Sequence, residues 1–174
     1  MKGWLPDKSE TSYKLFFLLV KQEMAKLGLE LSIESVISDY EISIIKAVTD
    51  ILQVPIRGCF FHFTQCLKRK MEKSGMKTKV QTTEKLQLFM KKCGSLAHLP
   101  VCDVALGMLK LREFSFDDPS IEQFKEEMLK YIQDFWIQGP FNPSVWSCWD
   151  RNEDNTNNNQ VCIEYNTAFL ECGK

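Results

Sequence analysis

The sequence predicts an α/β fold that is predominantly helical. Apolar residues recur at three- and four-residue spacing over most of the chain, and nearly without a break from residue 77 to about residue 134, which is the period of an amphipathic helix. Two short apolar runs, at residues 29–38 and 54–58, have instead the character of strands in a small sheet. The chain has 174 residues, of which 44% are hydrophobic and 26% charged, so one globular domain is expected.

A first amphipathic helix is expected to begin after the turn-forming segment 5–9 and to end at Gly28, a residue that commonly caps a helix at its carboxyl end. A short strand is also expected around residues 3–5. The buried face of the helix is defined by Tyr13, Phe16, Phe17, Val20, Met24 and Leu27.

The next elements are predicted in the order strand, carboxylate, helix, strand. The run 29–38 alternates roughly and ends in an apolar pair, with Asp39 at its carboxyl end. The helix that follows must stop before Pro55, because a proline disfavours helical geometry in the residue before it. Residues 54–58 then form the second strand of this unit.

The remaining two thirds of the chain is predicted to be all-helical. A helix over residues 60–74 is capped by Gly75, and further helices follow as far as residue 134 before a proline-rich turn at 139–143. Five asparagines among residues 152–160 predict an exposed loop, and a last helix is expected over residues 159–172. Breaks between the helices are expected near residues 94–95, 99–100 and 117–120.

Charge is distributed unevenly along the chain, although its formal net charge is only −1. Residues 57–92 hold ten Lys or Arg and two acids, whereas residues 113–171 hold twelve acids and three Lys or Arg. A basic surface that contacts phosphates, beside a carboxylate site, would give this pattern, and so would helices that are solvated on one face. Seven cysteines without regular spacing predict reduced thiols. The sequence has neither a signal peptide nor an apolar run long enough to span a bilayer.

Asp39 is the leading candidate for chemistry, because ligands of α/β folds bind at the carboxyl ends of strands. The alternative is that Asp39 caps the helix that begins near Tyr40. Cys59 and His62 share one face of the next helix and could form half of a zinc site, or a buried pair that anchors the helical segment. Lys68, Arg69 and Lys70 could contact DNA phosphates or form a solvated helix end.

Segments along nearly the whole chain together resemble the transposases of Mutator-like elements, a family of the DDE superfamily whose catalytic core is RNase H-like. Individually these motifs are soft, but they follow the family's order. The resembling segments are Leu5–Tyr13, Val36–Glu41, Gly58–Phe63 with Gln65, Ser95–Val101, Asp134–Ile137, Trp146, and Thr156–Asn158 with Glu164–Asn166.

The resemblance implies a single truncated transposase domain over residues 1–174. Residues 1–58 would be a partial RNase H-like core, residues 59–143 a large all-α insertion, and residues 144–174 a Trp/Asn-rich loop with a C-terminal core helix. The ancestral activity would be metal-dependent DNA strand cleavage and transfer in transposition. Transposon ends would be the partner, with Mg²⁺ or Mn²⁺ as cofactor, in a nuclear protein that can form a homo-oligomer and uses neither a membrane nor a small-molecule substrate.

In the family three carboxylates hold two metal ions. The resemblance assigns the second to Asp39 and the third to Glu164, with Glu171 and Glu153 as weaker alternatives, and its C-x-x-H signature to Cys59 and His62. In the family the first carboxylate lies on a central strand upstream of the segment that begins at Met1, so we expect no cleavage by this chain alone. The alternative function is a non-catalytic DNA-binding or protein-interaction module derived from a transposase. Trp146, Trp149, Phe60 and Phe61 are expected to be core aromatics and not stacking platforms for bases.

Overall fold

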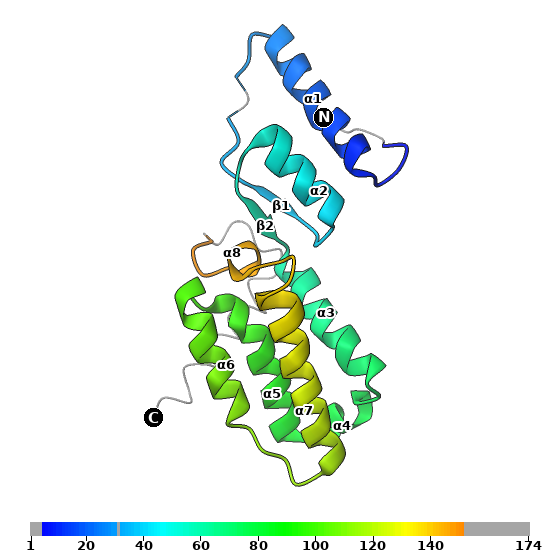
Figure 1. Cartoon of the computed structure of the whole chain (residues 1–174), viewed down its shortest axis with the longest axis vertical. Coiled ribbons are helices and arrows are strands. Elements are labelled where there is room, and N and C mark those ends of the chain that lie inside the picture. Colours follow the sequence, from blue (N-terminus) through cyan, green and yellow to red (C-terminus); the bar gives the residue numbers. More distant parts are fainter. Residues whose placement is uncertain (1–4, 31, 152–174) are drawn as a thin grey trace. The chain divides into compact units, whose positions relative to one another are not determined.

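A computed structural model describes residues 5–30 and 32–151 (Figure 1). These residues are mostly helical and include two short strands, so the predicted α/β, predominantly helical class is confirmed. Contacts divide the chain into two compact units, Met1–Cys59 and Phe60–Lys174. That boundary lies one residue from the predicted start of the helical insertion, and a single domain over residues 1–174 stays a prediction. A bilayer is not spanned by any described helix, since none combines the length and the apolar character required.

The first unit begins with helix α1, Glu10–Lys26, where the sequence predicts a helix. Its N-cap is Ser9, whose Oγ accepts a hydrogen bond from the main-chain N–H of Ser12 at 3.2 Å. The Asp7 carboxylate accepts from the Ser12 hydroxyl at 2.6 Å and from the Ser9 N–H at 2.9 Å. These hydrogen bonds, that from the Ser12 hydroxyl above all, lower the pKa of Asp7 to about 2. Gly28 follows the helix with φ of +68°, as expected of a residue that terminates a helix.

Two parallel strands and a helical connection complete the first unit. Strand β1, Val36–Ser38, pairs with β2, Ile56–Gly58, so that Val36 lies opposite Ile56. Helix α2, Ile42–Ala47, continues as the π-helical turn η1, Val48–Leu52, and both pack against α1.

The strand predicted over residues 29–38 is much shorter in the structure. Its first described residues, 29–30 and 32–35, are not strand, because β2 offers a hydrogen-bonding partner for only three residues of β1. Leu5 is the one described residue of the strand expected around 3–5, and it is not in a strand.

The second unit confirms the predicted all-helical segment. Its longer helices α3, α5, α6 and α7 pack together into a bundle (Figure 1). The elements are α3 Phe60–Lys73, α4 Lys77–Thr82, α5 Glu84–Ser95, η2 Leu96–His98, η3 Val101–Asp103, α6 Val104–Arg112, α7 Pro119–Tyr131, η4 Ile132–Ile137 and α8 Pro143–Trp146.

Three aromatic rings form the centre of the second unit. The Phe63 ring stacks on the Trp146 ring, with centroids 5.0 Å apart and planes 7° apart, and meets the Trp136 ring edge-on at 4.8 Å. All three side chains are fully buried. The indole Nε1 of Trp146 donates to the main-chain oxygen of Trp136 at 2.7 Å, so the segment after α7 is fixed to α8 by packing and by a buried hydrogen bond.

The expectation that four named aromatics are core residues is half right. Phe60 and Trp146 are buried, whereas Phe61 is 47% exposed and Trp149 is 63% exposed. Consecutive residues of a helix point about 100° apart, and at the start of α3 Phe60 faces the bundle whereas Phe61 does not. Trp149 lies just beyond Ser147, whose hydroxyl donates to the main-chain oxygen of Leu99 at 2.9 Å.

Candidate functional site

The carboxyl ends of β1 and β2 meet at one edge of the sheet. Asp39 follows β1 directly and Cys59 follows β2. The main-chain N–H of Cys59 donates to the Ser38 oxygen at 2.9 Å, which extends the pairing of the strands by one residue. The carboxylate of Asp39 and the thiol of Cys59 are therefore placed side by side at the edge where α/β folds bind ligands.

Asp39 does not cap the following helix. Helix α2 begins at Ile42, its N-cap residue is Glu41, and no side chain makes the capping hydrogen bond. Asp39 lies two residues before that N-cap and is exposed. The alternative that Asp39 caps this helix is therefore wrong, and Asp39 lies at the sheet edge.

A second carboxylate, Glu41, attaches α1 to the segment that follows β1. The Tyr13 hydroxyl donates to Glu41 Oε1 at 3.2 Å, and the Lys8 ammonium lies 3.6 Å from Oε2. Burial raises the pKa of Tyr13, and the negative charges of Glu41 and Asp39 raise it further.

Tyr40 covers the end of β2. A Cβ atom added to Gly58 would lie 2.2 to 2.6 Å from atoms of the Tyr40 ring, closer than real Cβ contacts allow. Only glycine at position 58 leaves room for this ring. The Tyr40 ring thus lies against the end of β2, and Asp39, one residue before it, follows β1 directly.

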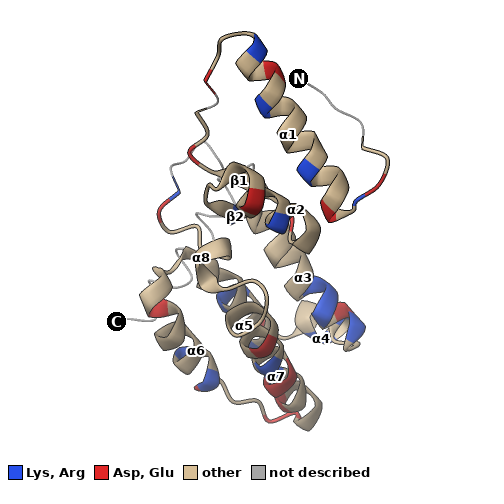
Figure 2. Ribbon diagram, turned by 45° about the horizontal axis from the view of Figure 1, so that its top comes forward, with Lys and Arg blue, Asp and Glu red and all other residues tan. Residues whose placement is uncertain are grey.

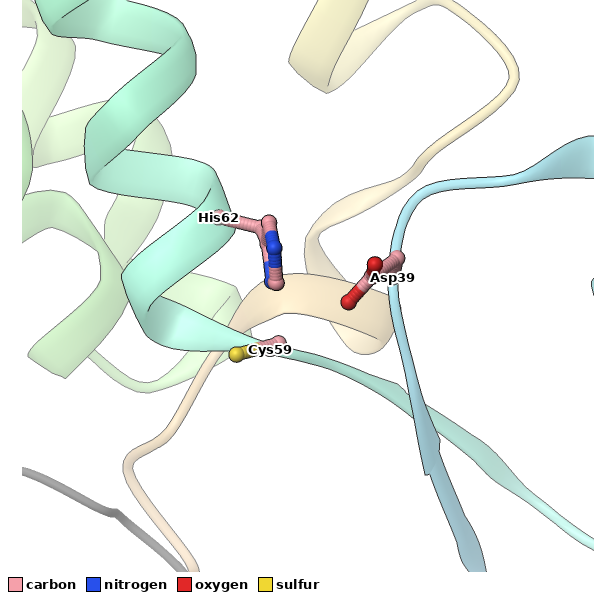
Figure 3. Close-up of side chains that lie close together, drawn as sticks. All are labelled: Asp39, Cys59 and His62. Carbon is pink, nitrogen blue, oxygen red and sulfur yellow. The ribbon is translucent and has the colours of Figure 1, made fainter.

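His62 lies in the first turn of α3, three residues after Cys59 (Figure 3). Asp39, Cys59 and His62 each offer one ligand atom, and the three atoms lie within 4.8 Å of one another. Between residues 5 and 151, with residue 31 aside, no other set of three His, Cys, Asp or Glu side chains has this geometry.

The ligand atoms indicate which ion this group could hold. Mg²⁺ and Mn²⁺ prefer oxygen ligands, whereas an imidazole nitrogen with a thiolate sulfur suits Zn²⁺ and chemically similar ions. One carboxylate, one thiol and one imidazole would supply three of the four positions of a tetrahedral zinc site and leave one for water or a further ligand. The group therefore fits a zinc-type ion better than the magnesium pair of a nuclease.

Glu164, with its alternatives Glu153 and Glu171, lies outside the described residues. The sequence also did not indicate that Asp39 and the C-x-x-H pair belong together. The register of two parallel strands joined by a short helix would have been the signal, because it aligns the residues that directly follow each strand.

The predicted phosphate-contacting residues lie on α3, which carries several Lys and Arg residues (Figure 2). Helix α7, in contrast, carries several acids. Lys68 and Arg69 are exposed, and neither forms an ion pair with a described acid. Lys70 is partly buried, and its ammonium lies 3.9 Å from the Glu127 carboxylate on α7. Lys68 and Arg69 therefore each present a charge to solvent, whereas Lys70 is paired.

Comparisons of this chain with protein-family models, with curated proteins and with solved structures find no match.

Proposed function

We propose that this chain is a transposase-type domain, related to the Mutator-like elements, that binds DNA without cleaving it. The observation that carries the proposal is the β1–α2–β2 unit with Asp39 at the carboxyl end of β1. The order of helix, strand, acid, helix and parallel strand before a large helical segment is the order that the family resemblance implies for an RNase H-like core. Such a protein would act in the nucleus, where its DNA lies.

The composition of the sheet edge argues against cleavage. Phosphodiester transfer by two metal ions needs several hard oxygen ligands to bind both ions and to stabilise the leaving oxygen. Among the described residues, the metal-binding group at this edge supplies one carboxylate, from Asp39, and its other members are a thiol and an imidazole. We propose that this group holds a zinc-type ion that supports the local structure.

DNA contact would come from the exposed face of α3. Arg69 points to solvent, and its guanidinium makes only a local hydrogen bond to Gln65 at 3.3 Å. An arginine in this state can release counterions from a phosphate backbone when DNA binds. Lys73, four residues further along the same helix, is exposed as well.

The DNA-binding proposal is tested by measuring affinity for duplex DNA as a function of salt. The logarithm of the association constant should fall linearly with the logarithm of the salt concentration, and Arg69→Glu should reduce the slope by about 0.9 if one phosphate contact is lost. Lys110→Glu is the matched control, because Lys110 is exposed on α6 and already pairs with Glu113 at 2.9 Å. A salt-independent affinity, or equal effects of both variants, would refute the proposal.

The metal proposal is tested with Co²⁺, whose bond to a thiolate has an intense ultraviolet absorption. The absorption should appear with the unmodified chain, vanish in Cys59→Ser and weaken in Asp39→Asn and His62→Gln. Cys102→Ser is the control, since Cys102 is an exposed free cysteine on η3. An absorption that survives in Cys59→Ser would show that another thiol binds the ion.

Catalysis is tested by incubating supercoiled plasmid with the chain in Mg²⁺ or Mn²⁺. We expect no nicking. Nicking that disappears in Asp39→Asn would contradict the non-catalytic proposal and would restore Asp39 as a catalytic carboxylate.

A further inference from the structure

The second unit has a groove that the DNA-binding proposal does not use. It lies between α3 and α5, with part of α4 at one end, and has a volume of about 560 Å³. Volumes of this size are typical of ligand-binding sites. Leu67 and Met71 of α3 form part of its apolar lining, together with Met90 of α5.

The rim of the groove carries positive charge only. Lys68 of α3 and Lys91 of α5 both line it, both are exposed, and neither forms an ion pair with an acid that the structure describes. No aspartate or glutamate is among the lining residues. The remaining polar lining residues are uncharged, so an occupant with negative charge on its flanks is favoured.

The shape of the groove indicates a helical occupant. Phe61 and Lys68 are seven residues apart on α3, and Gln87 and Gly94 are seven apart on α5, so each wall presents about two helical turns, or roughly 10 Å. Phe61 is 47% exposed at one end of this wall. Exposed aromatic and methionine side chains are frequent where an amphipathic helix binds, because they offer large and adaptable apolar contacts.

We propose that this groove binds an acidic amphipathic helix of a partner protein. Apolar side chains of that helix, spaced at i, i+3 or i+4 and i+7, would contact Phe61 and the two methionines, and its flanking acids would pair with Lys68 and Lys91. A single-stranded nucleic acid is disfavoured, because base stacking needs exposed rings and Phe61 is the only exposed ring at the groove. This inference does not depend on the Asp39 edge.

The experiment selects peptides from a random displayed library of 16-residue sequences on the whole chain and measures their affinities by fluorescence anisotropy. We expect the selected peptides to combine acids with apolar residues at helical spacing. Lys91→Glu and Lys68→Glu should each weaken their binding by about tenfold or more, as expected when a partly desolvated charge pair becomes a like-charge pair. Phe61→Ala should weaken it by a similar factor.

Control variants separate this proposal from DNA binding. Arg69→Glu, on α3 but outside the groove lining, should change peptide affinity less than twofold, and so should Asp39→Asn. The double variant Lys68→Glu with Lys91→Glu should no longer bind the acidic peptides. It should instead bind versions of these peptides in which lysines replace the acids. That reversal requires folded protein, so it excludes misfolding as the cause of the losses.

Three results would overturn the inference. The selection could yield no peptide whose binding depends on Phe61 and Lys91, or it could yield peptides without acids. A twelve-residue oligothymidylate could bind instead, with the same dependence on Phe61, which would assign the groove to single-stranded nucleic acid.

Discussion

Lowering the pH should destabilise the second unit through one buried histidine. His98 ends η2 and is only 7% exposed, and its ring lies 4.7 Å from the ring of Phe60. Burial disfavours the imidazolium, and the charge of Arg151 disfavours it further, so the pKa of His98 falls from the ordinary 6.5 to about 4. The folded protein therefore keeps this histidine neutral where an unfolded chain protonates it.

The sign and size of the effect follow from linkage between protonation and folding. Above pH 6.5 the histidine is neutral in both states and has no influence on the free energy of unfolding. Below pH 6.5 the imidazole is protonated in the unfolded state but stays neutral in the folded state. The free energy of unfolding therefore falls as the pH is lowered, until the folded pKa near 4 is reached. Between pH 8 and pH 5 this amounts to about 2 kcal/mol, and the full shift corresponds to about 3 kcal/mol.

The assay is urea unfolding followed by tryptophan fluorescence between pH 5 and pH 8, a range above the titration of most carboxylates. His98→Gln should remove most of the loss of stability on acidification, whereas His62→Gln, at the other histidine of the chain, should retain it. If the unmodified chain and His98→Gln lose stability in parallel as the pH falls, the reasoning from the buried imidazole is refuted.

Further substitutions test the packing by thermal or urea unfolding. Phe63→Ala should cost about 3–5 kcal/mol because it empties the aromatic centre, whereas Phe61→Ala, at an exposed position, should stay within about 0.5 kcal/mol. Gly58→Ala should destabilise the first unit by about 1–3 kcal/mol through the clash with the Tyr40 ring. Adding Tyr40→Ala should recover part of that loss. If alanine at position 58 acted only through the backbone, removing the ring would recover nothing. Trp146→Phe should cost about 1–3 kcal/mol, since two buried main-chain carbonyls lose the indole donor; an unchanged stability would mean that water replaces it.

Local sequence signals predicted the order of elements well. The helix that ends at Gly28, the carboxylate after the first strand and the helix that ends at Gly75 are each determined by residues next to one another in the chain. Glycines at +68° and +71° occupy conformations that other residues rarely adopt, so their positions indicate helix ends without knowledge of the tertiary structure.

Features that depend on residues distant in the chain were predicted less well. The length of β1 depends on its pairing with β2, about twenty residues away in the sequence. The pattern of residues 29–38 does not indicate how many residues of β2 are available for that pairing. The meeting of Asp39 with Cys59 depends on the same register. The groove between α3 and α5 depends on which helices are neighbours, which the periodicity of each helix alone does not specify.

The positions of residues around α3 lead to a last prediction, that DNA and an acidic helix can bind at the same time. At about 100° per residue, Phe61 and Lys68 fall on one side of the helix, Arg69 and Lys73 on a second, and the buried Phe63 on a third. The groove and the face proposed to contact phosphates are therefore adjacent but distinct. In a titration of the peptide-bound chain with duplex DNA, we expect peptide affinity to fall less than threefold at saturating DNA. Complete displacement would show that both ligands need the same side chains, and that Lys68 belongs to the DNA-binding surface and not to the groove.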